Sequence, residues 1–302
     1  MKEWLRDAVL EEEKEAESID GFGGKKDIWH IFVKLMQTIW ERGEIPQQMR
    51  WMTVVLIPKG GGDFRGIGLL EPFWKSIEIL IHRRLQVVEF HDCLHGFIGG
   101  RDTGTSTIKA KLAQQLAHLE QELLFETFVD LKKAYDAMDR ERCMEILVRY
   151  GVGPSMLRLI KHFWNTTLLV CRAVVYYGGP FQAFRGVTQG GPLSPRIFNM
   201  MVDALVREWL RRLLGEETAR YGYGAAVREL MAILYADDTI LASRDPVALQ
   251  KALDIIVELS ERVGLRTNTS KTKVMTCLPG KIRTRLSREA YNNSREGMHV
   301  SD

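Results

Sequence analysis

Two adjacent aspartates stand in the stretch Leu234-Tyr235-Ala236-Asp237-Asp238-Thr239, at the end of a short apolar run. Residues 229–235 predict one strand and residues 239–242 a second, so the pattern favours a β-hairpin with carboxylates at its turn. Neighbouring carboxylates repel each other unless a cation lies between them, which suggests a divalent metal site. Because aspartate is also a favoured turn residue, a solvated turn explains this stretch equally well when it is considered alone.

The composition is that of a folded protein. The chain has 302 residues, of which 45% are hydrophobic, enough for a sizeable core and one or two domains. No run reaches the roughly 18 apolar residues of a membrane helix, and charges stand where a signal peptide would be apolar. The four cysteines are far apart and form no CxxC pair, which argues against a zinc ribbon or a disulfide framework. We therefore expect a soluble intracellular protein with no membrane partner; the pattern does not distinguish nucleus from cytoplasm.

The charge changes sign along the chain although the net charge is only +3. The first twenty residues are acidic and the last thirty are basic. We expect a charged segment at 1–24 and a basic tail at 280–302 outside the core. A modest net charge can also hide a locally positive groove, as a nucleic-acid-binding protein needs.

Helices are predicted where apolar residues recur at helical spacing, and strands where β-branched or apolar runs are bounded by turn residues. The predicted helices are residues 28–40, 73–88, 105–122, 140–150, 154–164, 196–214 and 246–263. The predicted strands, besides the hairpin, are residues 51–57, 123–131, 168–177 and 274–278. Ile28 and Ile31 belong to the apolar side of the first helix. In the helix 105–122 the spacing predicts an inward face formed by Ile108, Leu112, Leu116 and Leu119.

A glycine-rich turn, Lys59-Gly60-Gly61-Gly62-Asp63-Phe64-Arg65, follows the strand predicted at 51–57. Its backbone N–H groups and two cations would suit a phosphate group, but it lacks the Walker spacing of glycines before Lys-Ser or Lys-Thr. A flexible surface loop is the simpler explanation of the glycines alone.

A third acid, Asp130, ends the strand predicted at 123–131. A single carboxylate at such a position is usually a helix cap or a turn residue. If the two acid-bearing strands lie side by side in one antiparallel sheet, however, three carboxylates come together. Hard oxygen ligands suit Mg²⁺, and two such ions can stabilise the attacking and leaving oxygens of a phosphoryl displacement. The three acids together therefore predict nucleotidyl-transfer chemistry.

Four motifs in this order resemble those of reverse transcriptases, most closely the enzymes of non-long-terminal-repeat (LINE-like) retrotransposons. They are Phe128-Val129-Asp130-Leu131-Lys132-Lys133-Ala134-Tyr135-Asp136, then Gln189-Gly190-Gly191-Pro192-Leu193-Ser194-Pro195 with Phe198-Asn199, then Tyr235-Ala236-Asp237-Asp238, then Gly264-Leu265 with Asn268 and Lys271-Thr272-Lys273. Where the family usually has Arg-Pro-Ile, this chain has Gly66 after Arg65; His95 and Thr188 also depart from the family pattern.

The resemblance implies an α+β fold: a right-hand polymerase with an antiparallel palm sheet, packed helices and fingers. It divides the chain into a charged segment 1–24, fingers 25–124, a first palm strand 125–139, a fingers–palm insertion 140–190, the rest of the palm 191–279 and a basic tail 280–302. This division leaves no room for a thumb, so we expect the thumb or an endonuclease to come from a separate chain or a missing segment.

The resemblance also implies a role for each site residue. Asp130 and Asp237 would hold two Mg²⁺ ions, with Mn²⁺ as a substitute, while the Leu131 carbonyl and Asp238 would assist. The residues implied to contact the nucleotide are Lys59 and Arg65 at the triphosphate, Gln189 at the sugar, Tyr135 as a steric gate and Lys271 as a proton donor to pyrophosphate. Two of these residues have a simpler explanation that involves no ligand. Tyr135 also suits a core position, and Lys271 suits an ordinary surface position.

The implied function is RNA-directed DNA synthesis from deoxynucleoside triphosphates on a primer and an RNA template. Two alternatives remain. One is a truncated retroelement relic that binds RNA or a partner without turnover. The other is an intron maturase or another palm-type polymerase.

Overall fold

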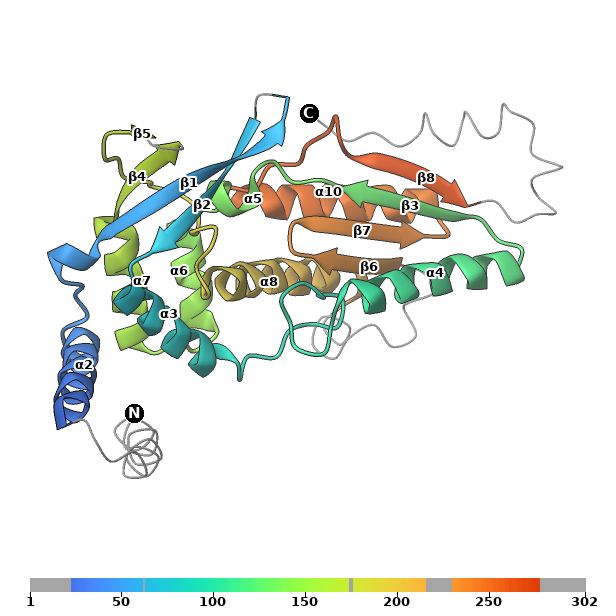
Figure 1. The fold of residues 1–302 in the computed structure, drawn as a ribbon. Coiled ribbons are helices and arrows are strands. Elements are labelled where there is room, and N and C mark those ends of the chain that lie inside the picture. The colour runs from blue at the N-terminus through green and yellow to red at the C-terminus, as the bar shows by residue number, and fades with distance from the viewer. Residues whose placement is uncertain (1–22, 62, 174–175, 216–229, 278–302) are drawn as a thin grey trace.

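The computed structural model describes residues 23–61, 63–173, 176–215 and 230–277. Two four-stranded sheets lie at opposite ends of the molecule with helices packed on them, which gives a mixed α+β fold (Figure 1). Most of the acidic segment predicted at 1–24, and all of the basic tail predicted at 280–302, lie outside the described residues.

The first sheet has the strand order β2-β1-β4-β5. β1 (Trp51–Gly60) pairs antiparallel with β2 (Asp63–Leu70) and parallel with β4 (Leu168–Ala173), and β5 (Tyr176–Tyr177) pairs with β4. The sequence did not predict β2, because Gly66 and Gly68 interrupt it and glycine is depleted in strands. The single strand predicted at 168–177 is divided between β4 and β5.

The second sheet has the order β6-β7-β3-β8 and is antiparallel throughout. Its strands are β6 (Leu230–Tyr235), β7 (Asp238–Ser243), β3 (Leu124–Val129) and β8 (Lys273–Cys277). β6 and β7 form the predicted hairpin around the two aspartates. β3, the strand before Asp130, is the direct neighbour of β7, so the predicted pairing of the acid-bearing strands is confirmed.

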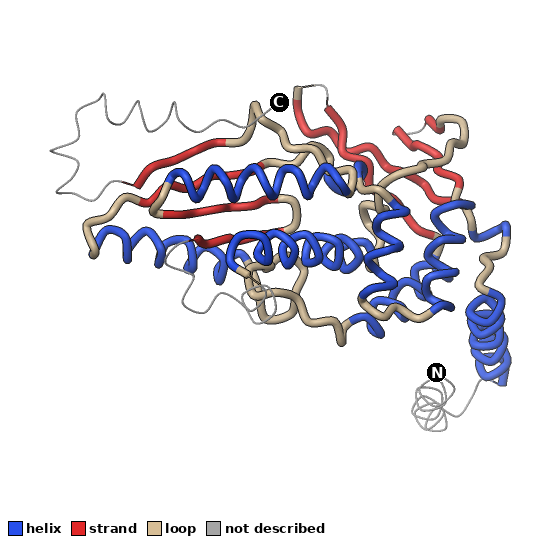
Figure 2. Tube along the Cα trace, turned by 180° about the vertical axis from the view of Figure 1, so that it is seen from behind, coloured by secondary structure: helices blue, strands red, loops and turns tan. Residues whose placement is uncertain are grey.

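Two long helices, α8 (Ser194–Leu214) and α10 (Pro246–Arg262), cover one face of this second sheet, as the view from behind shows (Figure 2). The main core lies between them and the sheet and includes Phe125, Leu241 and Trp209. The Trp209 indole Nε1–H donates to the Ala252 carbonyl at 2.7 Å, which ties α8 to α10. The sheet whose strands end in the acids is therefore packed on a layer of two helices that are tied to each other.

The opposite face of the second sheet is partly covered by α4 (Thr103–Leu119). This helix contacts the sheet through Ala110, Ala113 and Ala117, in a small apolar cluster with sheet residues such as Met231. The predicted inward face is wrong, because Ile108, Leu112, Leu116 and Leu119 are 65%, 52%, 41% and 75% exposed. The alanines recur at helical spacing as regularly as the larger residues do, and periodicity could not decide which stripe faces the sheet.

The remaining helices pack around the first sheet and the junction between the sheets. They are α2 (Gly23–Arg42), the 3₁₀ turn η1 (Gln47–Met49), α3 (Pro72–Leu85), α5 (Ala134–Ala137), α6 (Arg140–Arg149) and α7 (Pro154–Thr166). In α2 the second half is buried at Met36 and Ile39, whereas Ile28 and Ile31 are 70% and 65% exposed. The predicted burial of these two isoleucines is therefore wrong.

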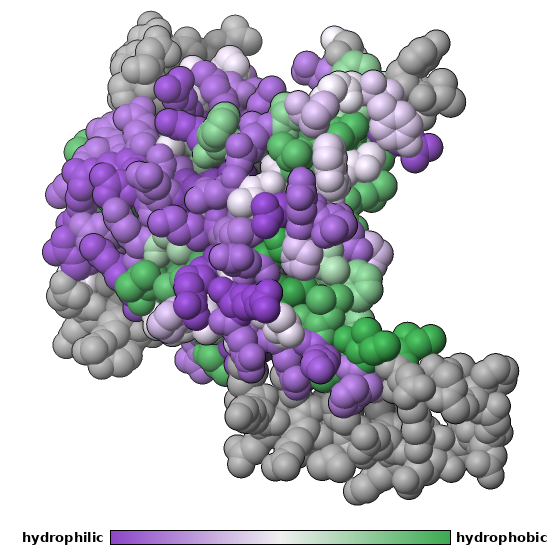
Figure 3. All heavy atoms as spheres, turned by 90° about the vertical axis from the view of Figure 1, so that its left-hand side faces the viewer, coloured by the Kyte–Doolittle hydropathy of each residue, from purple (hydrophilic) through white to green (hydrophobic). Residues whose placement is uncertain are grey.

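The surface is mixed in polarity. Figure 3 faces the left-hand end of Figure 1, and there hydrophobic groups lie among larger hydrophilic areas. Across the described ranges, no helix combines the length and the apolar character needed to cross a membrane.

Candidate active site

The three predicted acids lie at one end of the second sheet. Tyr235 pairs with Asp238, which leaves Ala236 and Asp237 as the two residues of the β6–β7 turn. Val129 pairs with Thr239. Because the strands are antiparallel, the next step of this register places Asp130 opposite Asp238. Residues 107 positions apart in the sequence (237 minus 130) thus meet at the same sheet end.

The acids also influence one another electrostatically. Burial raises the pKa of Asp238, and the negative charges of Asp237 and Asp130 raise it further. This mutual repulsion is what a divalent cation would relieve, and carboxylate oxygens are the ligands Mg²⁺ prefers. Within the described ranges, no group of three or more His, Cys, Asp and Glu side chains stands in a ready metal-binding arrangement. The donor chemistry therefore fits Mg²⁺, while the side chains do not converge in ligand geometry.

Asp130 is held by the loop that precedes β8. The Asn268 side chain donates from Nδ2 to Asp130 Oδ2 at 2.9 Å, and the Asn268 backbone N–H donates to the Asp130 carbonyl at 2.7 Å. Leu131 forms a β-bridge with Thr267 beside this contact. The sequence singled out Asn268 only as part of a motif, and the structure shows that it orients the carboxylate of Asp130. Lys271 lies in the same loop, where its side chain is exposed.

Tyr135 lies in the short helix α5 and packs against α8. Its ring stacks on the Phe198 ring with centroids 4.5 Å apart and an interplanar angle of 14°. Burial raises the pKa of the Tyr135 hydroxyl, and the charge of Asp237 raises it further. The hydroxyl oxygen is buried and has no hydrogen-bond partner among the described residues. Tyr135 therefore packs as a core residue and also lies close to the acids.

Gln189 joins the first sheet to the loop before α8. Its side chain donates from Nε2 to Asp136 Oδ1 at 3.1 Å, and its carbonyl accepts from the Gly68 N–H at 2.6 Å. A β-carbon on Gly190, which has a φ of 112°, would lie 2.6 Å from the Gly68 carbonyl oxygen. Gly68 and Gly190 are thus glycines at the place where the backbones of β2 and of this loop approach each other closely.

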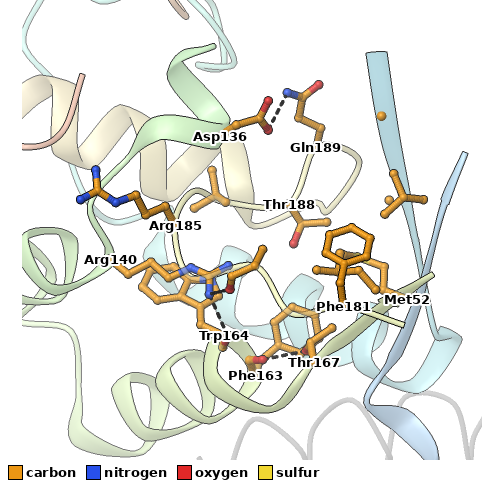
Figure 4. A pocket seen from close by; sticks show the side chains of 16 residues that line it. Met52, Asp136, Arg140, Phe163, Trp164, Thr167, Phe181, Arg185, Thr188 and Gln189 are labelled. Carbon is orange, nitrogen blue, oxygen red and sulfur yellow. Dashed lines mark hydrogen bonds between the residues drawn. The ribbon is translucent and has the colours of Figure 1, made fainter. Parts of the chain in front are cut away.

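A cavity of about 270 Å³ lies beside Gln189 (Figure 4). The Asp136–Gln189 hydrogen bond lies along one side, and aromatic side chains, among them Trp164, lie on the other. Arg140 donates to the carbonyls of Gly186 at 2.9 Å, Trp164 at 2.8 Å and Ala183 at 2.5 Å. Burial lowers the pKa of Arg140 to about 10. Sequence reasoning assigned no role to Arg140 or Asp136, because their partners are 24 or more residues away.

The two predicted phosphate-binding cations lie on the β1–β2 hairpin. Arg65 pairs across the ladder with Ile57, and Lys59 lies next to the tip of the hairpin. Both side chains are exposed, and neither makes a hydrogen bond or ion pair with another described residue. The structure thus leaves both cations accessible to a ligand but shows no contact between them and the acids.

The two sheets and the helices packed on them form a mixed α+β fold, and this fold is similar to that of two solved telomerase structures. The apo telomerase of Candida tropicalis is similar with a TM-score of 0.57 over 85% of this chain and 49% of that chain, at 14% identity. The Candida tropicalis telomerase in complex with a fragment of telomeric RNA matches with a TM-score of 0.55 over 83% and 45%, at 15% identity. At these identities the similarity shows the fold alone.

Residues 57–296 match the family model of reverse transcriptase (RNA-dependent DNA polymerase). Because this match covers most of the chain, the protein belongs to the reverse transcriptase family, and the resemblance seen in its motifs is confirmed. Within the family it is related to the Pol proteins of non-long-terminal-repeat retrotransposons.

Three of these relatives show the extent of the similarity. The Pol polyprotein of the R2DM element of Drosophila melanogaster is 25% identical over 80% of this chain and 23% of its own length. The R2 polyprotein of Nasonia vitripennis is 24% identical over 85% and 25%, and the 149 kDa protein of transposon TX1 of Xenopus laevis is 25% identical over 80% and 19%. The chain thus spans a quarter or less of the length of each.

Proposed function

We propose that this domain is an RNA-directed DNA polymerase that adds deoxynucleotides to a primer 3′-hydroxyl. The observation that carries the proposal is the meeting of Asp130 with Asp237 and Asp238 at one sheet end, where the charges of the first two raise the pKa of the third. Such a cluster of like charges is unfavourable without a cation, and carboxylates are the ligands that a metal-assisted nucleotidyl transfer would use.

Asp130 and Asp237 are proposed to hold two Mg²⁺ ions, with Asp238 and the Leu131 carbonyl assisting and Mn²⁺ as a substitute. When bound, the ions would neutralise charge that develops on the attacking and leaving oxygens. Asn268 contributes by fixing one carboxylate oxygen of Asp130 through its Nδ2 donor. A carboxylate fixed in this way loses less freedom when it binds a metal, because its hydrogen-bond partner already orients it.

The nucleotide would lie between the acids and the β1–β2 hairpin. Lys59 and Arg65 are proposed to bind the triphosphate, since both are exposed cations without protein partners among the described residues. Gln189 is proposed to contact the sugar and Tyr135 to exclude the ribose 2′-hydroxyl. Lys271 is proposed as the proton donor to pyrophosphate; its exposure leaves it free to reach a ligand.

The proposed partners are an RNA template, a nucleic-acid primer and deoxynucleoside triphosphates. The relatives are retrotransposon Pol proteins, and one structural neighbour was solved with a fragment of telomeric RNA. We assign the first sheet and its helices to the fingers and the second sheet to the palm. Because the match covers a quarter or less of the length of these relatives, a thumb and an endonuclease are proposed to come from other segments.

Primer extension tests the proposal. Wild-type protein and Asp237→Ala are each given poly(rA) with an oligo(dT) primer, then a DNA template, with deoxynucleotides or ribonucleotides and with Mg²⁺ or EDTA. We expect Mg²⁺-dependent extension with deoxynucleotides by the wild type only. A folded wild type that binds RNA but forms no product under any condition would contradict the proposal and favour RNA binding without turnover.

A further inference from the structure

The β6–β7 turn holds Ala236 in a backbone conformation that normally favours glycine. Ala236 and Asp237 are the two turn residues, and Ala236 has a φ of 55°. A residue with a β-carbon enters this left-handed region only at an energetic cost, because the β-carbon crowds the backbone. Surrounding structure therefore has to hold it there.

The segment formed by residues 91–96, here named the strap, runs along the edge strand β6 toward this turn. Leu94 forms a parallel bridge with Leu234. The Leu234 N–H donates to the Cys93 carbonyl at 2.8 Å, and the His95 N–H donates to the Leu234 carbonyl, also at 2.8 Å. The strap is thus bound to β6 up to the residue that precedes Tyr235.

Gly96, at the end of the strap, lies in close backbone contact with the β6–β7 turn. A β-carbon at Gly96 would lie 2.6 Å from the Ala236 nitrogen and 3.2 Å from the Tyr235 carbonyl carbon. Both neighbours are backbone atoms, so no side chain can move away to make room. Only glycine allows the strap to support the turn at this distance.

Helix α8 holds both ends of the strap. Asn199, which is 3% exposed, donates from Nδ2 to the Gly96 carbonyl at 2.7 Å. Asp203, one helical turn further along, accepts from the His91 N–H at 2.6 Å. The Asp203 carboxylate also accepts from Tyr150 and Arg207, which fixes that end of the strap firmly. At the other end, Asn199 is the side chain that holds Gly96 in its place.

We propose that Asn199 is a positioning residue: by holding Gly96 against Ala236, it sets the conformation of the turn that carries Asp237 and Asp238. The catalytic part of this inference rests on the proposed polymerase function, whereas the chain of contacts stands on the structure. Without the amide donor, the buried carbonyl of Gly96 loses this partner, and the end of the strap at Gly96 is held less firmly against the turn. A displacement of about 1 Å at a reacting group can lower a rate by roughly 100-fold.

Three variants test the proposal. Asn199→Ala removes the donor. Asn199→Asp keeps the shape but can donate to the Gly96 carbonyl only when the carboxyl is protonated. Met200→Ala is the matched control, because Met200 is a neighbour in α8 with 0% exposure and is not among the partners of Gly96. All three are compared for melting temperature, kcat, KM for deoxynucleotide, Mg²⁺ requirement and hydrogen exchange in residues 230–243.

We expect Asn199→Ala to lower kcat by about 10-fold or more, to raise the Mg²⁺ concentration needed for half-maximal rate and to leave primer–template affinity within twofold of the wild type. Asn199→Asp should lose most activity at high pH and regain it as the pH falls, because protonation restores the donor. Met200→Ala should lose stability without a change in Mg²⁺ requirement. Equal losses in Asn199→Ala and Met200→Ala, or an Asn199→Asp defect that does not depend on pH, would overturn the assignment.

Hydrogen exchange keeps this test separate from the test of polymerase activity. If the wild type forms no product, the polymerase proposal fails, but faster exchange of residues 230–243 in Asn199→Ala than in Met200→Ala still supports the positioning role. Equal exchange in the two variants contradicts that role whether or not the protein is active.

Discussion

The ring of Tyr135 stacks on the ring of Phe198, with centroids 4.5 Å apart and planes 14° from parallel. The stack fixes the Tyr135 ring on α5 against the first turns of α8, close to the Asp237 charge that helps raise its pKa. A ring stacked in this way cannot swing aside easily when a ligand arrives. This rigidity is what a steric gate needs, since a mobile side chain would discriminate poorly between two sugars that differ by one hydroxyl group.

Shortening Tyr135 should therefore relax sugar selection. We expect Tyr135→Ala to raise the relative use of ribonucleotides, measured as the ratio of kcat/KM for ribonucleotide and deoxynucleotide, by about 10-fold or more, equivalent to ~1.4 kcal/mol. Tyr135→Phe is the control, because it keeps the ring and removes a hydroxyl that has no partner among the described residues. That variant should keep selectivity and lose no stability. An unchanged ratio in Tyr135→Ala would remove the gate assignment.

Neutralising Asp237 should stabilise the metal-free protein while it abolishes activity. In EDTA, Asp237→Asn removes one of three mutually repelling carboxylates, and a gain of about 1 kcal/mol would raise the melting temperature by roughly 2–4 °C. Mg²⁺ should then stabilise the wild type by mass action and the variant much less. Thermal melts with EDTA and with Mg²⁺ measure both effects. Equal Mg²⁺ shifts in the two proteins would argue against Asp237 as a ligand.

Breaking the hydrogen bond between Gln189 and Asp136 should weaken nucleotide binding. Asp136→Ala frees the Gln189 amide, and a hydrogen bond of this kind contributes about 0.5–1.5 kcal/mol, so KM for deoxynucleotide should rise about 2–10-fold. Asp136→Asn retains an acceptor oxygen for Gln189 Nε2 and serves as the matched control. Steady-state kinetics with a saturating primer–template distinguish the two variants. If both raise KM equally, charge at position 136 matters rather than the contact with Gln189.

A buried acid beneath the glycine loop should make stability depend on pH. Glu78 in α3 accepts from Trp74 Nε1 at 2.9 Å and from the Leu193 N–H at 3.3 Å, and burial raises its pKa to about 7. The pKa of Glu78 is higher in the folded protein than in the unfolded chain. Its contribution to the free energy of unfolding is therefore complete below about pH 4.5 and is lost as the pH rises through 7.

Thermal or chemical unfolding at pH 5.5 and pH 8 compares the wild type with Glu78→Gln. The rise in the Glu78 pKa corresponds to about 3 kcal/mol of unfolding free energy in total. Glu78→Gln should therefore remove most of the dependence of stability on pH. The amide keeps one of the two acceptor contacts, so some stability at low pH should be lost. Parallel pH profiles for the two proteins would place the titrating group elsewhere.

The parts of the site that local patterns encode were predictable. The hairpin around Asp237 followed from two apolar runs, and Asp130 from its place at a strand end. The contacts between Asn268 and Asp130, and between Gln189 and Asp136, were not predictable, because they join residues 138 and 53 positions apart. No local signal specifies which distant side chain a loop will meet.

The errors in the fold have a different cause. β2 was missed because Gly68 packs closely against Thr188 and Gln189 of the loop before α8, a tertiary requirement that overrides strand propensity. The predicted orientation of α4 was wrong because its alanines and its larger apolar residues form two separate stripes on the helix. Periodicity identifies a helix, but it cannot choose between two stripes when both are apolar.

The outward stripe of α4 has a practical consequence for handling this protein. Ile108, Leu112, Leu116 and Leu119 together expose an apolar ridge to solvent, and apolar patches of this kind favour self-association as protein concentration rises. Preparations of the chain should scatter more light at high concentration, and replacing Leu112 and Leu116 by glutamate should suppress that scattering. Because these side chains point away from the sheet, the substitution should improve solubility without disturbing the acids.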